Sequence, residues 1–284
     1  MSTPRAQGLP TTGGTISFKT GAALWAGGMF GVLCVLPYVV RLQRDTLQAA
    51  IEQTGLSLPM LLAISVTQAA VVLAVAVAIG AWASRRVGLG APLLDALVQG
   101  GTLPPGAKRV LAQAVGLGVA CGGGIIALEL FVFVPLDPDG IGVLQERAGH
   151  PLVWQGLLAS FYGGIAEELQ LRLFLLALLA LGLRGVGRLA GANQRVLLPV
   201  WAFWGANVMA AVLFGLGHLP ATAALIPSTG VVVVRAVVLN GTAALAFGWL
   251  FRRNGIETAM VAHFAADVVL LVIAPLILVE GNLP

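Results

Sequence analysis

The chain has 284 residues, of which 58% are hydrophobic and only 10% are charged. Soluble domains carry about a quarter charged residues, so this composition excludes a water-soluble globular protein. The net charge of +4 does not indicate nucleic acid as a partner, because the cations lie in short loops between long apolar runs, as topology determinants do. Cys34 and Cys121 lie within such runs and predict neither a disulfide framework nor a zinc knuckle.

The first twenty residues are rich in glycine, threonine and proline, and we interpret residues 1–20 as a flexible cytoplasmic tail. The first apolar run starts late, is long and lacks an evident cleavage site, so we expect a membrane helix there and not a signal peptide.

Seven apolar runs follow, each long enough for a helix that crosses about 30 Å of hydrocarbon. They cover residues 22–40, 59–83, 110–134, 153–183, 196–217, 231–250 and 256–279. Between residues 219 and 230, Pro220 and Pro227 interrupt the pattern, and an eighth crossing or a re-entrant segment is the alternative there. The sequence therefore predicts an all-α polytopic transmembrane bundle of about seven to eight helices. Glycines at 122–124 and 163–164 predict close packing between them.

The distribution of lysine and arginine predicts the orientation. With the N-terminus inside, eleven of the sixteen cations lie in inside segments and three lie in outside segments. Positive residues are retained on the cytoplasmic side, so this asymmetry favours an inside N-terminus. We expect an integral protein of a bacterial cytoplasmic (inner) membrane, surrounded by membrane lipid and without a nucleic-acid partner.

The fourth apolar run contains three ionisable residues, Glu167, Glu168 and Arg172. Each such group inside a bilayer costs about 2.5–3.5 kcal/mol on insertion scales, so each needs a reason. Glu168 and Arg172 are four residues apart on one helical face, which predicts an ion pair, whereas Glu167 points elsewhere and is available. Polar contacts that only hold helices together are the alternative reading. In other runs, Arg235 either reaches the membrane surface or pairs with a carboxylate.

Histidines mark two further runs. The fifth run ends with Phe214 and His218 four residues apart, and the seventh carries His263 and Asp267 with the same spacing. Together with Glu167, these side chains are of the types that activate water, because a buried carboxylate can act as a general base. Two histidines and a glutamate are also the ligands of catalytic zinc in several peptidases, although the HExxH motif is absent here.

These strings resemble the CPBP family of intramembrane glutamic endopeptidases, which includes CAAX prenyl endopeptidases and bacteriocin-processing and immunity proteins. The family pattern is EExxxR, then FxxxH, then HxxxN or HxxxD, on successive membrane helices. The chain carries these three motifs in the same order. The resemblance covers roughly residues 153–279, so we divide the chain into the tail, N-terminal membrane helices at 21–150 and a CAAX-protease-like catalytic core at 151–284.

The resemblance implies hydrolysis of a peptide bond in a membrane-associated or lipidated protein or peptide. Glu167 would be the base that activates water, with His218 helping to hold that water. Glu168 and Arg172 would orient the site through their ion pair, with Phe214 beside them.

The resemblance also implies that His263 and the residue four positions later stabilise the oxyanion of the tetrahedral intermediate. Here that residue is Asp267, and an ionised aspartate cannot donate a hydrogen bond as asparagine can. Asp267 is therefore protonated, orients His263 or binds a metal. The reaction needs either no cofactor or a divalent metal such as zinc. Its ligands would then be Glu167, His218, His263 and Asp267.

Two other functions remain open. A non-enzymatic immunity or scaffold protein would keep the motifs for packing alone. A proton-coupled transporter would use the buried charges as a relay, although no internal repeat is evident. In a flat arrangement, His218 lies near the outer end of its helix and His263 near the inner end of its own, so their convergence requires tilted or broken helices.

Overall fold

The computed structural model describes residues 16–148, 152–191 and 195–280, and every regular element within these ranges is a helix. In chain order the elements are α1 (Phe18–Leu42), α2 (Arg44–Thr54), α3 (Leu58–Val87), α4 (Pro92–Val98), α5 (Ala107–Leu128), η1 (Glu129–Phe133), α6 (Val134–Leu136), α7 (Pro138–Ala148), α8 (Val153–Phe161), η2 (Tyr162–Glu167), η3 (Leu169–Leu176), α9 (Ala177–Leu189), α10 (Val200–Gly217), α11 (Leu219–Ala223), α12 (Gly230–Asn254), α13 (Ile256–Val268), η4 (Val269–Ile273) and α14 (Ala274–Glu280). The η elements are stretches of wider π-helix.

Seven helical segments within the described residues are long and apolar enough to span a membrane, which confirms the predicted all-α membrane bundle. They are Phe18–Leu42, Leu58–Val87, Ala107–Leu136, Val153–Leu189, Val200–Ala223, Gly230–Asn254 and Ile256–Ile277. The chain is therefore an integral membrane protein. No eighth crossing forms between residues 219 and 230, because α11 is only 5 residues long and ends before the bend that leads to α12.

Local sequence explains where the helices begin and end. Residues 1–15 of the predicted tail lie outside the described residues, but α1 begins at Phe18 because the Ser17 side chain accepts a hydrogen bond from the Thr20 amide at 3.1 Å. The fifth span begins at Val200 and not at residue 196, because Pro199 lacks an amide hydrogen and disfavours a helical residue before it. Gly88 ends α3 with φ of 75°, in the left-handed region that glycine enters without a steric penalty.

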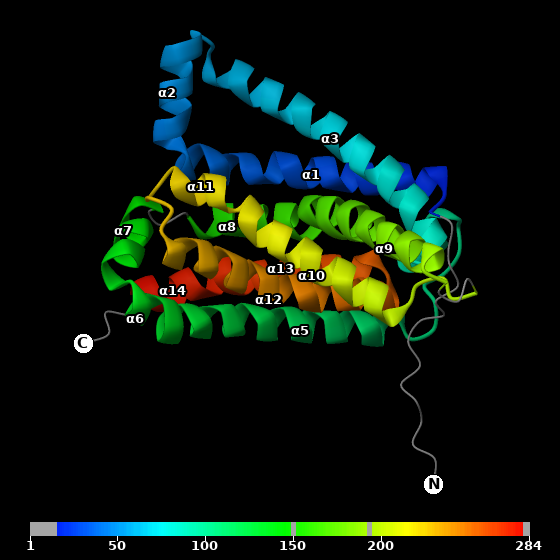
Figure 1. Cartoon of the computed structure of the whole chain (residues 1–284). Helices are drawn as coiled ribbons and strands as arrows, with labels where there is room; N and C mark the ends of the chain where they lie inside the picture. Colours follow the sequence, from blue (N-terminus) through cyan, green and yellow to red (C-terminus); the bar gives the residue numbers. More distant parts are fainter. Residues whose placement is uncertain (1–15, 149–151, 192–194, 281–284) are drawn as a thin grey trace.

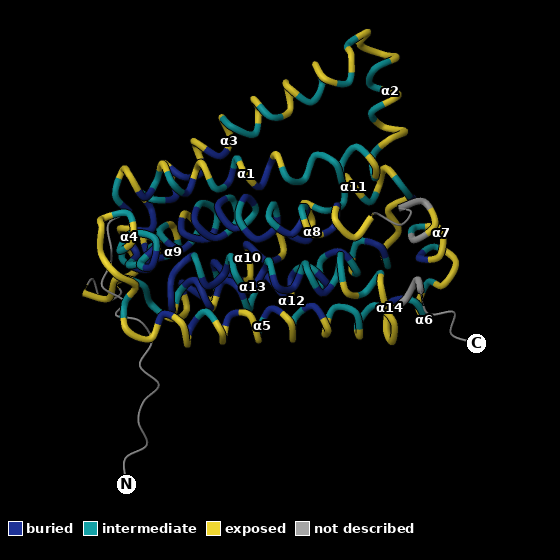
Figure 2. The backbone as a smooth tube through the Cα atoms, turned by 180° about the vertical axis from the view of Figure 1, so that it is seen from behind, coloured by how far each residue is buried: buried dark blue, intermediate teal, exposed yellow. Residues whose placement is uncertain are grey.

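The spans lie roughly side by side, with α13 among several of them (Figure 1). α13 packs against α5, α12, α8 and η2, whereas α1 packs along α8 and η2 on the other side. α2 and the first half of α3 stand away from the rest, and exposed residues dominate there (Figure 2). No residue of η3 or α13 is exposed, whereas α9 and α10 each keep an exposed face, so the innermost elements come from the second half of the chain. Below, we call the two ends of this bundle the α4 end and the α7 end.

The predicted close packing at glycines is confirmed at some positions and wrong at others. A Cβ atom added at Gly122 would lie 2.8 Å from Val269 Cβ, and one added at Gly164 would lie 2.8 Å from Phe264 Cβ. Both distances are shorter than side chains tolerate. The approach of η4 to α5 at Gly122, and of α13 to η2 at Gly164, therefore requires glycine. Gly123 and Gly124, in contrast, face open space.

Candidate functional site

The acidic motif lies where the fourth span widens. α8 passes into the π-helical stretches η2 and η3, and Glu168 is the single residue between them. π-Helical turns are rare and often occur at functional sites, because they shift the direction in which side chains project. This widening lets Glu167 and Glu168 point toward the same histidine on α13, although they are neighbours in the chain.

Glu168 and Arg172 form the predicted ion pair in the centre of the bundle. Arg172 Nη1 lies 2.8 Å from Glu168 Oε1, and both side chains are buried. Arg172 Nη2 also donates a hydrogen bond to the Ala244 carbonyl on α12, at 3.3 Å. The guanidinium lies 5.4 Å from the ring centroid of Phe214 and 5.5 Å from that of Phe247. A buried charge is costly unless it is paired in this way, so the role of Glu168 is structural.

His263 is held between Glu168 and the more accessible carboxylates. Its ring stacks on Phe247, with centroids 5.1 Å apart, and its Nδ1 lies 2.7 Å from Glu168 Oε1. A carboxylate only accepts hydrogen bonds, so Nδ1 carries a proton and donates it. Nε2 then faces Glu167 Oε2 at 3.7 Å and Asp267 Oδ1 at 3.6 Å. These separations are too long for direct hydrogen bonds.

The four acidic and basic side chains around this point differ in exposure. The side chain of Glu168 is 0% exposed, that of His263 8%, that of Asp267 16% and that of Glu167 23%. The site therefore has a closed side, formed by Glu168 and its ion pair, and an open side, formed by Glu167 and Asp267.

His218 lies one aromatic ring away from this cluster. It caps the C-terminal end of α10, and its Nδ1 lies 2.9 Å from the Phe214 carbonyl oxygen. Its ring meets that of Phe214 edge to face at 4.6 Å, and Phe214 in turn meets His263 at 6.1 Å. The two histidines that seemed to lie at different depths are thus joined through Phe214, which both contact.

The predicted metal ligands are not arranged as a metal site. Across the residues that the structure describes, no group of three or more histidine, cysteine, aspartate or glutamate side chains has an arrangement that could hold a metal ion. Nδ1 of His263 lies against Glu168 and Nδ1 of His218 faces a backbone carbonyl, so only Nε2 of each histidine is available as a ligand. Whether the reaction uses a metal therefore stays a prediction, and we derive no step through one.

Two contributors to the site were not expected from the sequence. Phe247, which supports the face of His263, is one aromatic residue in an apolar run and carries no local signal. Gly163 was expected only to pack closely. A Cβ atom there would overlap Asp267 Oδ2 and lie 3.1 Å from His263 Nε2, so the glycine keeps space open beside both groups.

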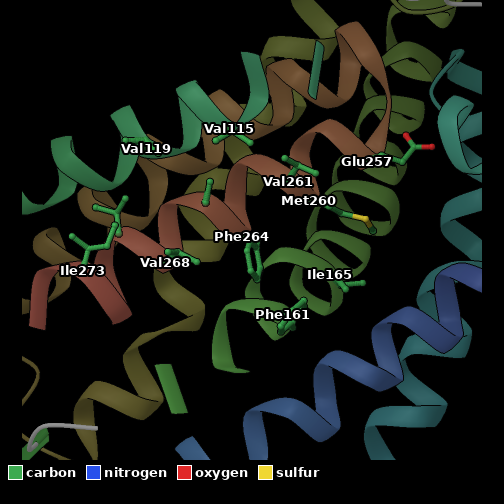
Figure 3. A pocket seen from close by; sticks show the side chains of 12 residues that line it. Val115, Val119, Phe161, Ile165, Glu257, Met260, Val261, Phe264, Val268 and Ile273 are labelled. Atoms are coloured by element: carbon green, nitrogen blue, oxygen red, sulfur yellow. The ribbon is translucent and has the colours of Figure 1, made fainter. Parts of the chain in front are cut away.

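An apolar groove runs along the neighbouring face of α13 (Figure 3). It encloses about 540 Å³ and lies between α5 on one side and α8 with η2 on the other. Its lining includes Val119, Phe161, Ile165, Val261, Phe264 and Ile273. Glu257 stands at the α4 end, with its carboxyl group turned away from the apolar side chains, and accepts a hydrogen bond from the Leu94 amide at 2.7 Å. Phe264 follows His263 directly, so groove and site occupy adjacent faces of one helix.

Comparison with known proteins gives one match. A family model described as Type II CAAX prenyl endopeptidase Rce1-like matches residues 149–269, a stretch that contains all three motifs. No curated protein and no solved structure matches the chain. The match confirms the predicted resemblance and, together with the seven apolar helices, an intramembrane endopeptidase as the general class.

Proposed function

We propose hydrolysis by a glutamate-activated water, on the premise that residues 149–269 belong to the Rce1-like type II CAAX prenyl endopeptidases, which are proteases. One observation carries the proposal, the different surroundings of two adjacent carboxylates. Glu168 is paired with both Arg172 and His263, whereas Glu167 Oε2 lies 3.7 Å from Nε2 of His263. A partly exposed carboxylate beside an oriented imidazole has the geometry of a general base.

In this mechanism a water lies beside Glu167 and His263, within hydrogen-bonding reach of both. Glu167 takes a proton from the water. At the same time the water oxygen attacks the carbonyl carbon of the peptide bond, which gives a tetrahedral oxyanion. Glu167 then returns the proton to the leaving amine as the C–N bond breaks. A protonated imidazole donates from both nitrogens, so Nε2–H of His263 is the expected oxyanion donor, with Asp267 beside it. His218, behind Phe214, would help to hold the water only if the Phe214 ring moves.

The substrate is proposed to be a membrane-associated or lipidated protein or peptide. The apolar groove supports this, since it lies on the face of α13 next to the site and is lined by carbon atoms. A hydrocarbon chain in this groove would gain about 25 cal/mol for each Å² removed from water, although less within lipid. The charge asymmetry further supports an N-terminus in the cytoplasm of a bacterium, with the protein in the inner membrane.

The test compares membrane and secreted peptides by mass spectrometry from cells that express the wild type or Glu167→Gln at equal levels. Glutamine keeps the shape and hydrogen bonds of the side chain but loses its basicity. We expect a precursor that accumulates only in the Glu167→Gln cells. Glu52→Gln is the matched control, because Glu52 is exposed on α2 and, among the described residues, accepts a side-chain hydrogen bond from Gln48 alone, at 3.0 Å.

Identical peptidomes would overturn the proposal. If any cellular phenotype of the protein then persists in Glu167→Gln, the non-enzymatic partner becomes the better reading. Loss of ion flux from proteoliposomes in the same variant would instead support the transporter.

A further inference from the structure

α10 and α12 pack along each other in opposite directions, and their contacts recur at every turn of both helices. The contacting pairs are Gly215 with Val237, Ala211 with Gly241 and Asn207 with Leu245. A Cβ atom added at Gly215 would lie 2.5 Å from Val237 Cα, so the backbones approach closely there. At the third pair, Asn207 Nδ2 donates a hydrogen bond to the Leu245 carbonyl at 3.0 Å. Asn207 is therefore the polar member of a row of close helix contacts.

Both ends of the Asn207 amide are placed by α12. The side chain is buried, and a buried amide is costly unless it is hydrogen-bonded, which Nδ2 is. Its Oδ1 lies where Gly248 has no side chain, since a Cβ atom there would overlap this oxygen. A slip of one helical turn in either direction would bring Ala244 or Arg252 to the place of Gly248. Asn207 thus favours one register of α10 against α12, as polar side chains between membrane helices do.

The turn of α12 that Asn207 contacts also carries two contacts of the site. Within residues 244–248, the carbonyl of the first residue accepts a hydrogen bond from Arg172 Nη2 at 3.3 Å. Phe247, in the same turn, stacks on His263 with ring centroids 5.1 Å apart. A rotation or slip of this turn would therefore move the ring that supports His263.

α10 contributes a second aromatic ring to the same two side chains. Phe214 follows Asn207 by seven residues and so projects from nearly the same face of α10. The Arg172 guanidinium lies 5.4 Å from the Phe214 centroid and 5.5 Å from the Phe247 centroid. His263 also meets both rings, Phe214 at 6.1 Å and Phe247 at 5.1 Å. Because one ring is on α10 and the other on α12, their separation depends on the register of these two helices.

We propose that Asn207 is a positioning residue of the active site, which holds α10 and α12 in register so that Phe214 and Phe247 keep the His263 ring in place. Asn207 acts through α12: its amide sets the height of Phe247, Phe247 supports the face of His263, and His263 presents Nε2 to Glu167. This inference rests on the proposed function, because it concerns the same site.

The first experiment measures cleavage by the purified full chain in detergent micelles, with the precursor that accumulates in Glu167→Gln cells. Asn207→Leu roughly keeps the side-chain volume and removes the hydrogen bond, and we expect kcat to fall about tenfold. KM should change little, because the residues that line the apolar groove belong to α5, α8, η2, α13 and η4. Asn240→Leu is the matched control and should keep wild-type kcat, since the Asn240 amide donates to the Ala236 carbonyl of its own helix at 2.9 Å.

Phe247→Leu tests the route of the effect. If Asn207 acts by placing the Phe247 ring, Asn207→Leu should lower kcat less than about twofold in the Phe247→Leu background, because residues that act through one contact are not additive. A change that only weakens the fold would lower kcat by the same factor in both backgrounds.

The second experiment does not need cleavage. An aromatic ring stacked on an imidazole shifts the resonances of the imidazole protons, so the His263 resonances report the position of Phe247. In histidine-labelled protein, the His263 signal is the one that disappears in His263→Gln. We expect Asn207→Leu to move it toward its position in Phe247→Leu, and Asn240→Leu to leave it unchanged.

Wild-type His263 resonances in Asn207→Leu, or an equal loss of kcat in both backgrounds, overturn the inference. If Asn207→Leu does not fold, Gly248→Ala replaces it, because its Cβ displaces the same amide and should move the same resonances. The proposed function fails separately: it is overturned if Glu167→Gln accumulates no precursor, and the His263 resonances then still decide the role of Asn207.

Discussion

Glu168 Oε1 lies 2.7 Å from His263 Nδ1 and 2.8 Å from Arg172 Nη1, which joins the fourth and seventh spans at one atom. Arg172 Nη2 extends this connection to the sixth span through the Ala244 carbonyl. The contact between Glu168 and His263 places a proton on Nδ1 and turns Nε2 toward Glu167 and Asp267. Orientation of an imidazole by a second carboxylate is a common requirement of catalytic histidines. Four predictions follow from this site and its surroundings.

Arg172→Met should destabilise the protein strongly, because it leaves the Glu168 carboxylate buried without its cation. Removal of one partner of a buried ion pair typically costs about 3–5 kcal/mol. The double variant Glu168→Gln with Arg172→Met removes both charges and should recover much of this loss. Unfolding in detergent micelles measures both, and a double variant that is less stable than Arg172→Met would contradict the prediction.

Gly163→Ala should inactivate the enzyme without unfolding it. Its Cβ would overlap Asp267 Oδ2 and press on His263 Nε2, so the two groups must move. Displacements of about 1 Å in an active site can cost about a hundredfold in rate. Cleavage of the precursor measures the effect. Gly123→Ala on α5 is the control, since nothing lies within 4 Å of its Cβ position and activity should be unchanged.

Asp95, on α4 between two spans, should make stability depend on acidic pH. Burial raises the pKa of this carboxyl, but hydrogen bonds from Thr20, Gln99 and Ser17 outweigh burial and hold the pKa below its ordinary value of 3.8. Because the folded pKa is lowered, the stabilisation is present above 3.8 and is lost as pH falls through the folded pKa. The melting temperatures of the wild type and Asp95→Asn should converge as the pH falls through the folded pKa of Asp95. Parallel curves at every pH would argue against this role.

Arg235 and Glu129 should stabilise the contact between α12 and η1. Arg235 Nε and Nη2 each donate to one Glu129 oxygen at 2.8 Å, a bidentate pair at membrane depth. Arg235→Gln should destabilise the protein by about 3 kcal/mol, since it leaves a largely buried carboxylate unpaired. Adding Glu129→Gln should restore most of the loss. Denaturation in detergent tests this, and no recovery in the double variant would show that the guanidinium acts through other contacts.

Local sequence was sufficient for what depends on composition and on spacing within one helix. Long apolar runs have no stable place in water, so the seven spans could be predicted, and four-residue spacing places Glu168 beside Arg172 on any helix. The start of the fifth span was misplaced by four residues, because Pro199 acts on the helix more strongly than the apolar run does.

Contacts between helices were decided by the tertiary structure alone, because they depend on how each helix is rotated and how closely it packs. The sequence left Arg235 without an assigned partner, and only the packing of α12 against η1 brings Glu129 to it. In the same way, the choice of Glu168 as the partner of His263, the support of that ring by Phe247 and the space at Gly163 arise from the π-helical widening and the close approach of α13. Hydrophobicity and periodicity do not encode these distances.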